Sequence, residues 1–298
     1  MDNIVCIVGP TASGKTSLAV ALALQYQGEV VSADSRQIYR GLDVGTEKVT
    51  VEEMQGVPHH CIDIASPRRA FSVEQWKRRA ERAVRGIVRR GNLPIVAGGT
   101  GQYLDALVYN QSFPAVPPNS TLRTRLARRS TTELYAQLQK LDPERARTVD
   151  KFNPRRLIRA IEIADALGSV PKLQRTEAVY TTLWIGLNPG IEQLTERINA
   201  RLDDTLTQGL VQETQMLRDM HLSWNRIDEL GLEYRSAAAY LRGKLSAVDM
   251  RTRMQLDLRQ YAKRQLRWFK RNKEIHWYTD PDAAFAACEE HSLLSSMS

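Results

Sequence analysis

Cysteine is scarce in this 298-residue sequence, and long apolar runs are absent. Cys6, Cys61 and Cys288 are far apart and include no Cys-x-x-Cys pair, which argues against a disulfide framework and a cysteine-based zinc finger. No apolar run approaches the length of a bilayer span, and the first residues do not resemble a signal peptide. We therefore expect a cytoplasmic protein that has reduced thiols and does not associate with a membrane.

Acidic residues are outnumbered by basic ones. The sequence has 34 Asp and Glu against 42 Lys and Arg, a formal net charge of +8, and its apolar content of 42% disfavours a disordered chain. Much of the basic excess lies between residues 242 and 277. Clustered lysine and arginine neutralise phosphates, so nucleic acid is a reasonable partner.

The clearest motif is the octapeptide GPTASGKT, which fits G-x-x-x-x-G-K-[ST] without a mismatch. It lies between an apolar run at 4–8 and a helix-forming run at 17–24, the strand–loop–helix context that this motif requires. Backbone N–H groups and the lysine bind phosphate, and the threonine hydroxyl is placed to bind Mg²⁺. The predicted diphosphate or triphosphate site comprises Gly9, Pro10, Thr11, Ala12, Ser13, Gly14, Lys15 and the metal ligand Thr16.

Strand-like and helical segments alternate along most of the chain. We expect strands at 4–8, 29–32, 61–64, 94–97 and 180–187, and helices at 17–24, 73–88, 102–108 and 191–207. This alternation predicts an α/β fold, a P-loop-containing and mostly parallel sheet flanked by helices. A proline-rich break and a charged helical stretch predict a helical insertion subdomain at 115–179 within a core domain of 1–114 and 180–298.

Asp34 and Thr100 each follow an expected strand. Ligands of parallel sheets lie at the carboxyl ends of the strands, so we expect both residues to converge on the phosphate motif. An NTP hydrolase usually has an apolar strand that ends in a metal-binding Asp, whereas the strand here ends in GGTG, which disfavours an ATPase. From the residues alone, Asp34 could bind Mg²⁺ or accept a proton from a substrate.

The segment 259–271 is predicted to be a basic helix, with Tyr261, Gln265, Trp268 and Phe269 at near-helical spacing. One interpretation is an amphipathic helix that buries its aromatic side chains and exposes its charges. The interpretation that we favour is an RNA-binding helix, since basic groups among aromatic side chains can contact phosphates and stack on bases.

Seven blocks of the sequence resemble, in order and spacing, the bacterial tRNA dimethylallyltransferases. The blocks are GPTASGKT, ADSRQIYRGLDVGT, VPHHCIDI, FSVEQW, VAGGTGQYLDAL, NPRRLIRAIEI and QYAKRQLRWFKR. This family transfers a dimethylallyl group from dimethylallyl diphosphate to N6 of the adenine adjacent to the anticodon in tRNA. The resemblance implies that GPTASGKT, with Mg²⁺, binds the pyrophosphate of the isoprenoid, which leaves intact.

The resemblance also implies catalytic roles for three residues. Asp34 would accept the N6 proton, a role worth on the order of 10²- to 10⁴-fold in rate. Thr100 would reach the bridging oxygen of the leaving group, and Arg201 would bind the pyrophosphate, with Arg197 as a competing candidate in the same expected helix.

For the tRNA anticodon stem-loop, the resemblance implies contacts from three segments and two single residues. They are Asp34, Ser35, Arg36, Gln37, Thr100, Arg123, Arg155, Arg156, Leu157, Ile158, Arg159, Lys263, Arg264, Gln265, Arg267, Trp268 and Lys270. We expect the target base to leave its stack, with its edge contacted by polar groups such as Gln37. We also expect the protein to act as a monomer.

Two features carry no site prediction. The adjacent residues His59 and His60 point to different faces, and no other residues at the spacing of metal ligands surround them. We therefore expect a structural role for this pair. The segment GLEYR at 231–235 differs from the GY-containing turn that is common in the family, so no contact is carried over there.

Two other functions stay open at this point. An adenylate isopentenyltransferase would prenylate free AMP, ADP or ATP and would not need the basic segment at 259–271. A P-loop kinase or RNA-binding ATPase would release phosphate from ATP or transfer it.

Overall fold

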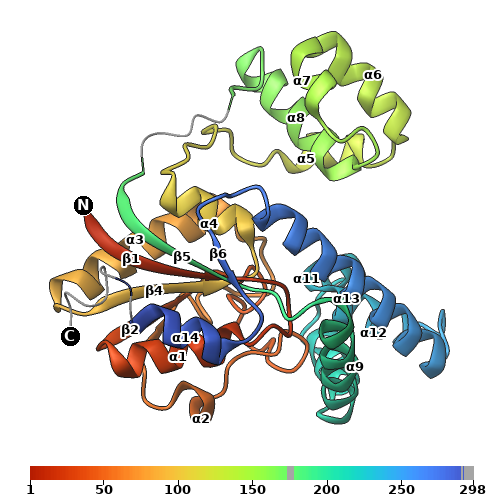
Figure 1. Cartoon of the computed structure of the whole chain (residues 1–298). Helices are drawn as coiled ribbons and strands as arrows, with labels where there is room; N and C mark the ends of the chain where they lie inside the picture. Colours follow the sequence, from red (N-terminus) through yellow and green to blue (C-terminus); the bar gives the residue numbers. More distant parts are fainter. Residues whose placement is uncertain (173–177, 290, 292–298) are drawn as a thin grey trace. The chain divides into compact units, whose positions relative to one another are not determined.

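The computed structural model describes residues 1–172, 178–289 and 291. A six-stranded parallel sheet lies at its centre, with strand order β3-β2-β4-β1-β5-β6 (Figure 1). Its strands are β1 (Asp2–Val8), β2 (Gly28–Ser32), β3 (His59–His60), β4 (Leu93–Gly98), β5 (Tyr180–Leu187) and β6 (His276–Tyr278). The expected α/β fold with a parallel sheet is confirmed.

Strand β1 lies in the middle of the sheet and is covered on both faces. Ile4, Cys6 and Val8 pack into one hydrophobic core, and Val5 and Ile7 pack into another. Successive side chains of a strand point to opposite faces, so a strand buried on both faces is apolar throughout. This burial explains the unbroken apolar run that precedes the phosphate motif.

Helices cover both faces of the sheet, and loops and turns join the elements (Figure 1). The helices are α1 (Lys15–Gln25), α2 (Val51–Met54), α3 (Val73–Arg89), α4 (Gly101–Val108), α5 (Ser120–Leu126), α6 (Thr131–Leu141), α7 (Pro143–Thr148), α8 (Pro154–Leu167), α9 (Ile191–Thr207), α10 (Leu210–Asp219), α11 (Trp224–Leu230), α12 (Leu232–Leu241), α13 (Ala247–Phe269) and α14 (Pro281–Glu289). Helices α1 and α14 pack on one face of the sheet, and α3 and α4 pack on the other.

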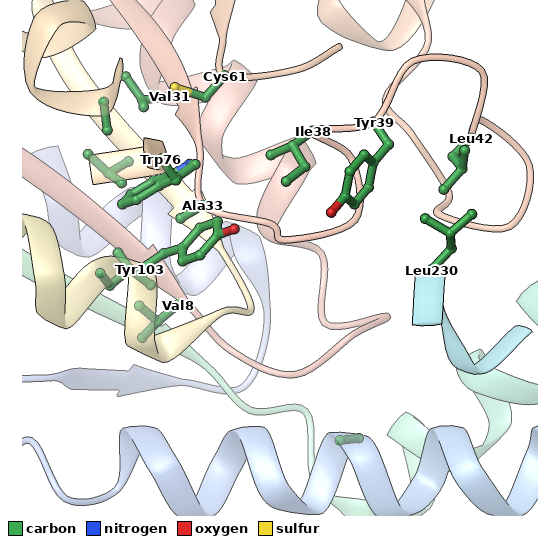
Figure 2. Packing of buried hydrophobic residues seen from close by; sticks show 14 of the residues in the cluster. Val8, Val31, Ala33, Ile38, Tyr39, Leu42, Cys61, Trp76, Tyr103 and Leu230 are labelled. Carbon is green, nitrogen blue, oxygen red and sulfur yellow. The ribbon is translucent and has the colours of Figure 1, made fainter. Parts of the chain in front are cut away.

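A stacked aromatic pair fixes the end of β2. The rings of Trp76 and Tyr103 are 4.4 Å apart and nearly parallel, next to Val31 and Ala33 (Figure 2). The indole Nε1 of Trp76 donates a hydrogen bond of 3.0 Å to the carbonyl oxygen of Ser32. Helices α3 and α4 thereby hold the backbone immediately before Asp34.

The chain divides into two compact units, Met1–Asn110 with Glu177–Ser298, and Gln111–Thr176. The second unit contains α5 to α8 around an apolar core that includes Leu126, Leu157 and Ile161. Its helices begin at side-chain caps, namely Asn119, Ser130, Asp142 and Asn153, whose oxygens accept bonds from first-turn N–H groups. Domain boundaries at 114/115 and 179/180 remain a prediction.

Two expected elements differ from the structure, and one strand of the sheet was not expected. The strand expected at 61–64 is wrong, because the strand is the short His59–His60 and Cys61 and Asp63 have positive φ angles of 64° and 54°, which interrupt an extended chain. The sheet also contains β6, which was not expected. Helix α13 begins at Ala247, twelve residues before the expected helix at 259–271.

Within the described part of the chain, no helix combines the length and the apolarity needed to cross a membrane.

Candidate active site

The phosphate motif forms the turn between β1 and α1. Gly9 has a φ of +152°, and a Cβ atom there would lie 2.6 Å from the carbonyl oxygen of Leu187, so this position requires glycine. Gly14 caps α1 in the left-handed conformation, and the helix begins at Lys15. The turn therefore ends at the N-terminus of an 11-residue helix, where free backbone N–H groups favour an anion.

Lys15 lies at the centre of a cluster of charges. Its Nζ donates a hydrogen bond of 2.5 Å to the carbonyl oxygen of Pro10, so the side chain folds over the motif. The pKa of Lys15 is lowered to about 8, first by burial and then by the positive charge of Arg201, while the carboxylates of Asp34 and Glu47 act in the opposite direction. Asp34, Glu47 and Arg201 therefore lie close enough to Lys15 for their charges to act on it.

Arg201 on α9 forms an ion pair with Glu47, with 2.7 Å between Nη2 and Oε2. Arg197, the competing candidate from the same helix, instead acts on the carboxylate of Asp280. Of the two arginines, Arg201 is the one whose charge acts on Lys15.

Glu47 is a site residue that the sequence analysis missed. Burial raises its pKa above the ordinary value, whereas nearby Arg201 and Lys15 act in the opposite direction. It directly follows the block ADSRQIYRGLDVGT, but its partner Arg201 is distant in sequence. No sequence pattern linked the two residues, so only the structure could reveal this pair.

Asp34 and Thr100 are brought together as expected from the strand ends. The Oδ1 atom of Asp34 accepts hydrogen bonds from the backbone N–H groups of Arg36 (2.7 Å) and Gln37 (3.4 Å). The Oγ1 atom of Thr100 accepts a bond of 3.1 Å from the backbone N–H of Ser35 and donates one of 3.3 Å to its Oγ. The loop of the candidate base is therefore joined directly to the GGTG turn.

The next two residues of this loop are held by the protein itself. The Nε2 group of Gln37 donates to the carbonyl oxygen of Glu47 (3.1 Å), and its Oε1 accepts from Ser32 Oγ (3.3 Å). Arg36 Nη1 donates to the carbonyl oxygen of Glu229 (2.6 Å). Both ends of the Gln37 amide therefore already have protein partners, which limits the role expected for it at a base edge.

Gln265 on α13 links the phosphate motif to the GGTG turn. Its Oε1 accepts from the backbone N–H of Thr11 (3.0 Å) and its Nε2 donates to the carbonyl oxygen of Gly99 (3.0 Å). Its side chain is buried, and both amide ends have protein partners. Gln265 is thus placed to hold the motif and the turn together, rather than to face an external ligand.

Trp268, one helical turn further, packs on the start of α4. A Cβ atom at Gly101 would lie 2.1 Å from Trp268 Cδ1, so the helix can approach only because this residue is glycine. The guanidinium of Arg271 lies over the indole, 4.0 Å from the ring centroid. The indole therefore lies between the glycine backbone and a cation.

The other predicted contacts on α13 lie on its exposed side. Lys263, Arg264, Arg267 and Lys270 are exposed, whereas the helix buries Ala262 and Phe269. The helix is therefore amphipathic and also presents four cations to solvent. Its binding to RNA stays a prediction.

In the second unit, the six predicted contacts fall into three groups. Arg155 and Arg156 are exposed at the start of α8. Arg123 and Arg159 both bind the carboxylate of the buried Glu162. Leu157 is fully buried in the core and its side chain is not available to a ligand, and Ile158 is half-buried.

Glu233 is a second titratable group that the sequence analysis did not assign. The pKa of Glu233 is raised to about 7, first by burial and also by the carboxylates of Glu47 and Asp34, while Arg36 acts in the opposite direction. Glu233 belongs to the segment GLEYR, so this departure from the family pattern places a carboxyl group close to the candidate base.

A divalent cation fits the donor set at the motif. Thr16 is exposed in the first turn of α1, beside the place where the diphosphate would bind. Mg²⁺ usually keeps several waters and takes one or two protein ligands together with substrate phosphates, so one hydroxyl near Lys15 and acidic groups is sufficient. Among the described residues, no group of three or more metal-ligating side chains exists that would bind a metal by itself.

His59 and His60 have separate structural partners. Nδ1 of His59 lies 2.8 Å from the carbonyl oxygen of Val57, and Nε2 of His60 lies 2.6 Å from Oε2 of the buried Glu29. The side chains do not converge on a common ligand position, and their contacts agree with the structural role that was expected.

Fold and site together define a class of protein, an α/β protein of the P-loop type whose phosphate motif lies beside a carboxylate and a basic helix. The family model described as IPP transferase matches residues 37–272. The chain belongs to this family, which confirms the resemblance drawn from the seven blocks.

Similar proteins cover nearly the whole chain. A tRNA dimethylallyltransferase of Thermomicrobium roseum is 43% identical over 92% of this chain and 85% of its own length. A tRNA dimethylallyltransferase of Anoxybacillus flavithermus is 38% identical over 94% of this chain and 91% of its own length. Among solved structures, the tRNA isopentenylpyrophosphate transferase of Bacillus halodurans has a TM-score of 0.75 at 34% identity and covers 100% of this chain and 98% of its own. The structure of a eukaryotic dimethylallyltransferase acting on tRNA has a TM-score of 0.78 at 25% identity, and the match covers 100% of this chain and 78% of that one.

Proposed function

We propose that this protein transfers a dimethylallyl group from dimethylallyl diphosphate to N6 of the adenine adjacent to the anticodon in tRNA, and releases pyrophosphate. The observation that supports this most strongly is the pair of hydrogen bonds between Ser35 and Thr100. They join the loop of the candidate base to the turn beside the phosphate motif, as an in-line transfer from diphosphate to a nucleophile requires.

The nucleophile needs a base, since the lone pair of an adenine amino group is delocalised into the ring. Asp34 is the candidate: both backbone bonds that it accepts go to Oδ1, which fixes the carboxylate. As the bond from N6 to the allylic carbon forms, the N6 proton passes to Asp34 and the bond from that carbon to the diphosphate oxygen breaks.

The leaving group needs positive charge and hydrogen-bond donors. Lys15, Arg201 and the N–H groups at the start of α1 would bind the pyrophosphate oxygens, and the Thr100 hydroxyl would stabilise the bridging oxygen. Mg²⁺ bound at Thr16 would neutralise further charge on the pyrophosphate.

The anticodon stem-loop would contact the exposed cations of α13 and the basic residues of α8. A tRNA substrate also suggests a cytoplasmic location, and we propose that one monomer suffices, since the proposed reacting groups all come from one chain.

Labelled dimethylallyl diphosphate offered together with unmodified tRNA, AMP and ATP tests the proposal. We expect label in the tRNA and release of pyrophosphate. Label that enters only AMP would instead support an adenylate isopentenyltransferase, and phosphate release from ATP without label transfer would support a kinase or ATPase.

A further inference from the structure

Glu162 is a buried carboxylate on α8 that receives four hydrogen bonds. Its side chain is 1% exposed. Oε1 accepts from the backbone N–H of Asn119 (2.6 Å) and from Nε of Arg123 (2.9 Å), and Oε2 accepts from Nη2 of Arg123 (2.7 Å) and Nη1 of Arg159 (2.5 Å). All of these partners lie in the second unit.

This carboxylate is ionised. Burial alone would raise the pKa of Glu162, but the bonds from Arg123, the Asn119 amide and Arg159 outweigh burial and hold the pKa below its ordinary value. Removing one partner of such a group would leave an uncompensated buried charge, which is costly.

The two arginines are therefore held side by side. Their Nη atoms contact the same oxygen of Glu162, although two adjacent guanidinium groups would otherwise repel each other. Nη2 of Arg159 also donates to the carbonyl oxygen of Val116 (3.0 Å), which fixes its plane. The conformational entropy of these two long, flexible side chains is thus lost during folding and not during binding.

Both guanidinium groups still have donors to offer. Each guanidinium has five N–H donors, and the contacts above use two of those in Arg123 and two of those in Arg159. The side chains remain 41% and 36% exposed. The three groups together carry a net positive charge that faces solvent.

We infer that Glu162 is a positioning residue that presents Arg123 and Arg159 as a preformed clamp for one stretch of RNA phosphate backbone. The inference rests on the proposed tRNA substrate, and it deepens that proposal by assigning affinity to a carboxylate that does not contact the RNA. Paired arginines held in fixed planes suit phosphate oxygens, which bind guanidinium groups in a bidentate manner.

The direction in which Glu162→Gln changes RNA affinity distinguishes this inference from a simple effect of net charge. Glu162→Gln keeps the shape of the side chain and removes a negative charge, so electrostatics alone predicts tighter RNA binding. Positioning predicts the opposite, because an amide cannot accept all four bonds and its NH₂ group faces donors. We expect the Kd for an anticodon stem-loop RNA to rise about tenfold and the salt dependence to become shallower.

Asp165→Asn is the matched control, because Asp165 is an exposed carboxylate on the same helix. It should leave the Kd unchanged or slightly lower. Binding by Glu162→Gln that is as tight as binding by this control would overturn the inference.

A double-mutant cycle removes ambiguity about folding. In the background Arg123→Ala with Arg159→Ala, Glu162→Gln should cause no further loss of affinity, whereas a general structural defect would add its own loss. Prenyl transfer by Glu162→Gln should show a raised KM for RNA with an unchanged kcat; a loss in kcat of the same size as the loss in affinity would also overturn the inference. RNA binding is measured without the prenyl donor, so failure of the proposed reaction would leave this test intact.

Discussion

At the scale of single residues, the account depends on how each carboxylate is held. Asp34 accepts two backbone bonds at Oδ1, and within the described residues Oδ2 has no hydrogen-bond partner that would compete with a substrate. Glu47 is bound to Arg201, and Glu162 is bound to two arginines. Because these contacts differ, we propose different roles for three similar side chains, namely base for Asp34, ion-pair partner for Glu47 and positioning group for Glu162.

Asp34→Asn tests the role of the base. The amide oxygen can still accept the N–H groups of Arg36 and Gln37, so the loop should keep its shape while the proton acceptor is lost. We expect single-turnover prenyl transfer to fall by roughly 10²- to 10⁴-fold with little change in the Kd for RNA. Loss of RNA binding without a separate catalytic defect would refute the assignment.

Glu233 makes stability depend on pH. Its pKa of about 7 in the folded protein lies above that of an unfolded glutamate, so the folded state binds more protons between about pH 4.5 and 7. Folding stability from this group is therefore lost as the pH rises through that window. Glu233→Gln should raise Tm at pH 8 by about 2–4 °C relative to the wild type and raise it much less at pH 5.

Thermal unfolding at the two pH values measures this difference, and Asp165→Asn again serves as a control with an exposed carboxylate. An equal change in Tm at pH 5 and pH 8 for Glu233→Gln would contradict the raised pKa.

At the scale of elements, the contact of α13 with the GGTG turn determines the site. Gln265 bridges the motif and the turn, and Trp268 packs where Gly101 lacks a side chain. The same helix exposes Lys263 and Arg267 on its other side. One element thus supports the phosphate motif and presents cations to solvent, where we propose that RNA binds.

A pair of glycine substitutions tests this packing. Gly101→Ala would place Cβ 2.1 Å from Trp268 and should lower the free energy of unfolding by roughly 1–3 kcal/mol. Gly86→Ala, within α3, meets only the end of Arg90 at 3.5 Å and should instead stabilise by roughly 0.5–1 kcal/mol. Denaturant unfolding of both variants measures the difference, and equal effects would argue against the tight approach of α13.

The exposed side of α13 makes a separate prediction. Lys263→Ala with Arg267→Ala should weaken binding of the anticodon stem-loop and lower the slope of log K against log salt by about 2. Arg82→Ala with Arg89→Ala, two exposed arginines of α3, is the matched control. A control that weakens binding equally would show that only net charge matters.

At the scale of the whole molecule, the sequence predicted what local patterns determine. The parallel sheet followed from alternating strands and helices, and the phosphate turn followed from one octapeptide with its flanking segments. The two-residue β3 was misplaced and the three-residue β6 was missed, because strands this short show no periodicity and form only by pairing with β2 and β5.

In the site as well, the sequence predicted the features that follow from local patterns and missed those that depend on long-range contacts. Asp34, Thr100 and Lys15 could be proposed because each occupies a recognisable position after a strand. Glu47 could not, since its role depends on Arg201 on a distant helix, and the contacts of Gln265 with the phosphate motif and the turn are also long-range. Tertiary contacts of this kind have no spacing that a sequence pattern can reveal.

The most direct measurement compares two anticodon stem-loops that differ at one position, adenine in one and a purine without its amino group in the other. The account predicts prenyl transfer and stoichiometric release of pyrophosphate with adenine, and neither with the amino-free purine. Equal pyrophosphate release from both RNAs, or a prenyl group attached elsewhere than N6, would contradict it.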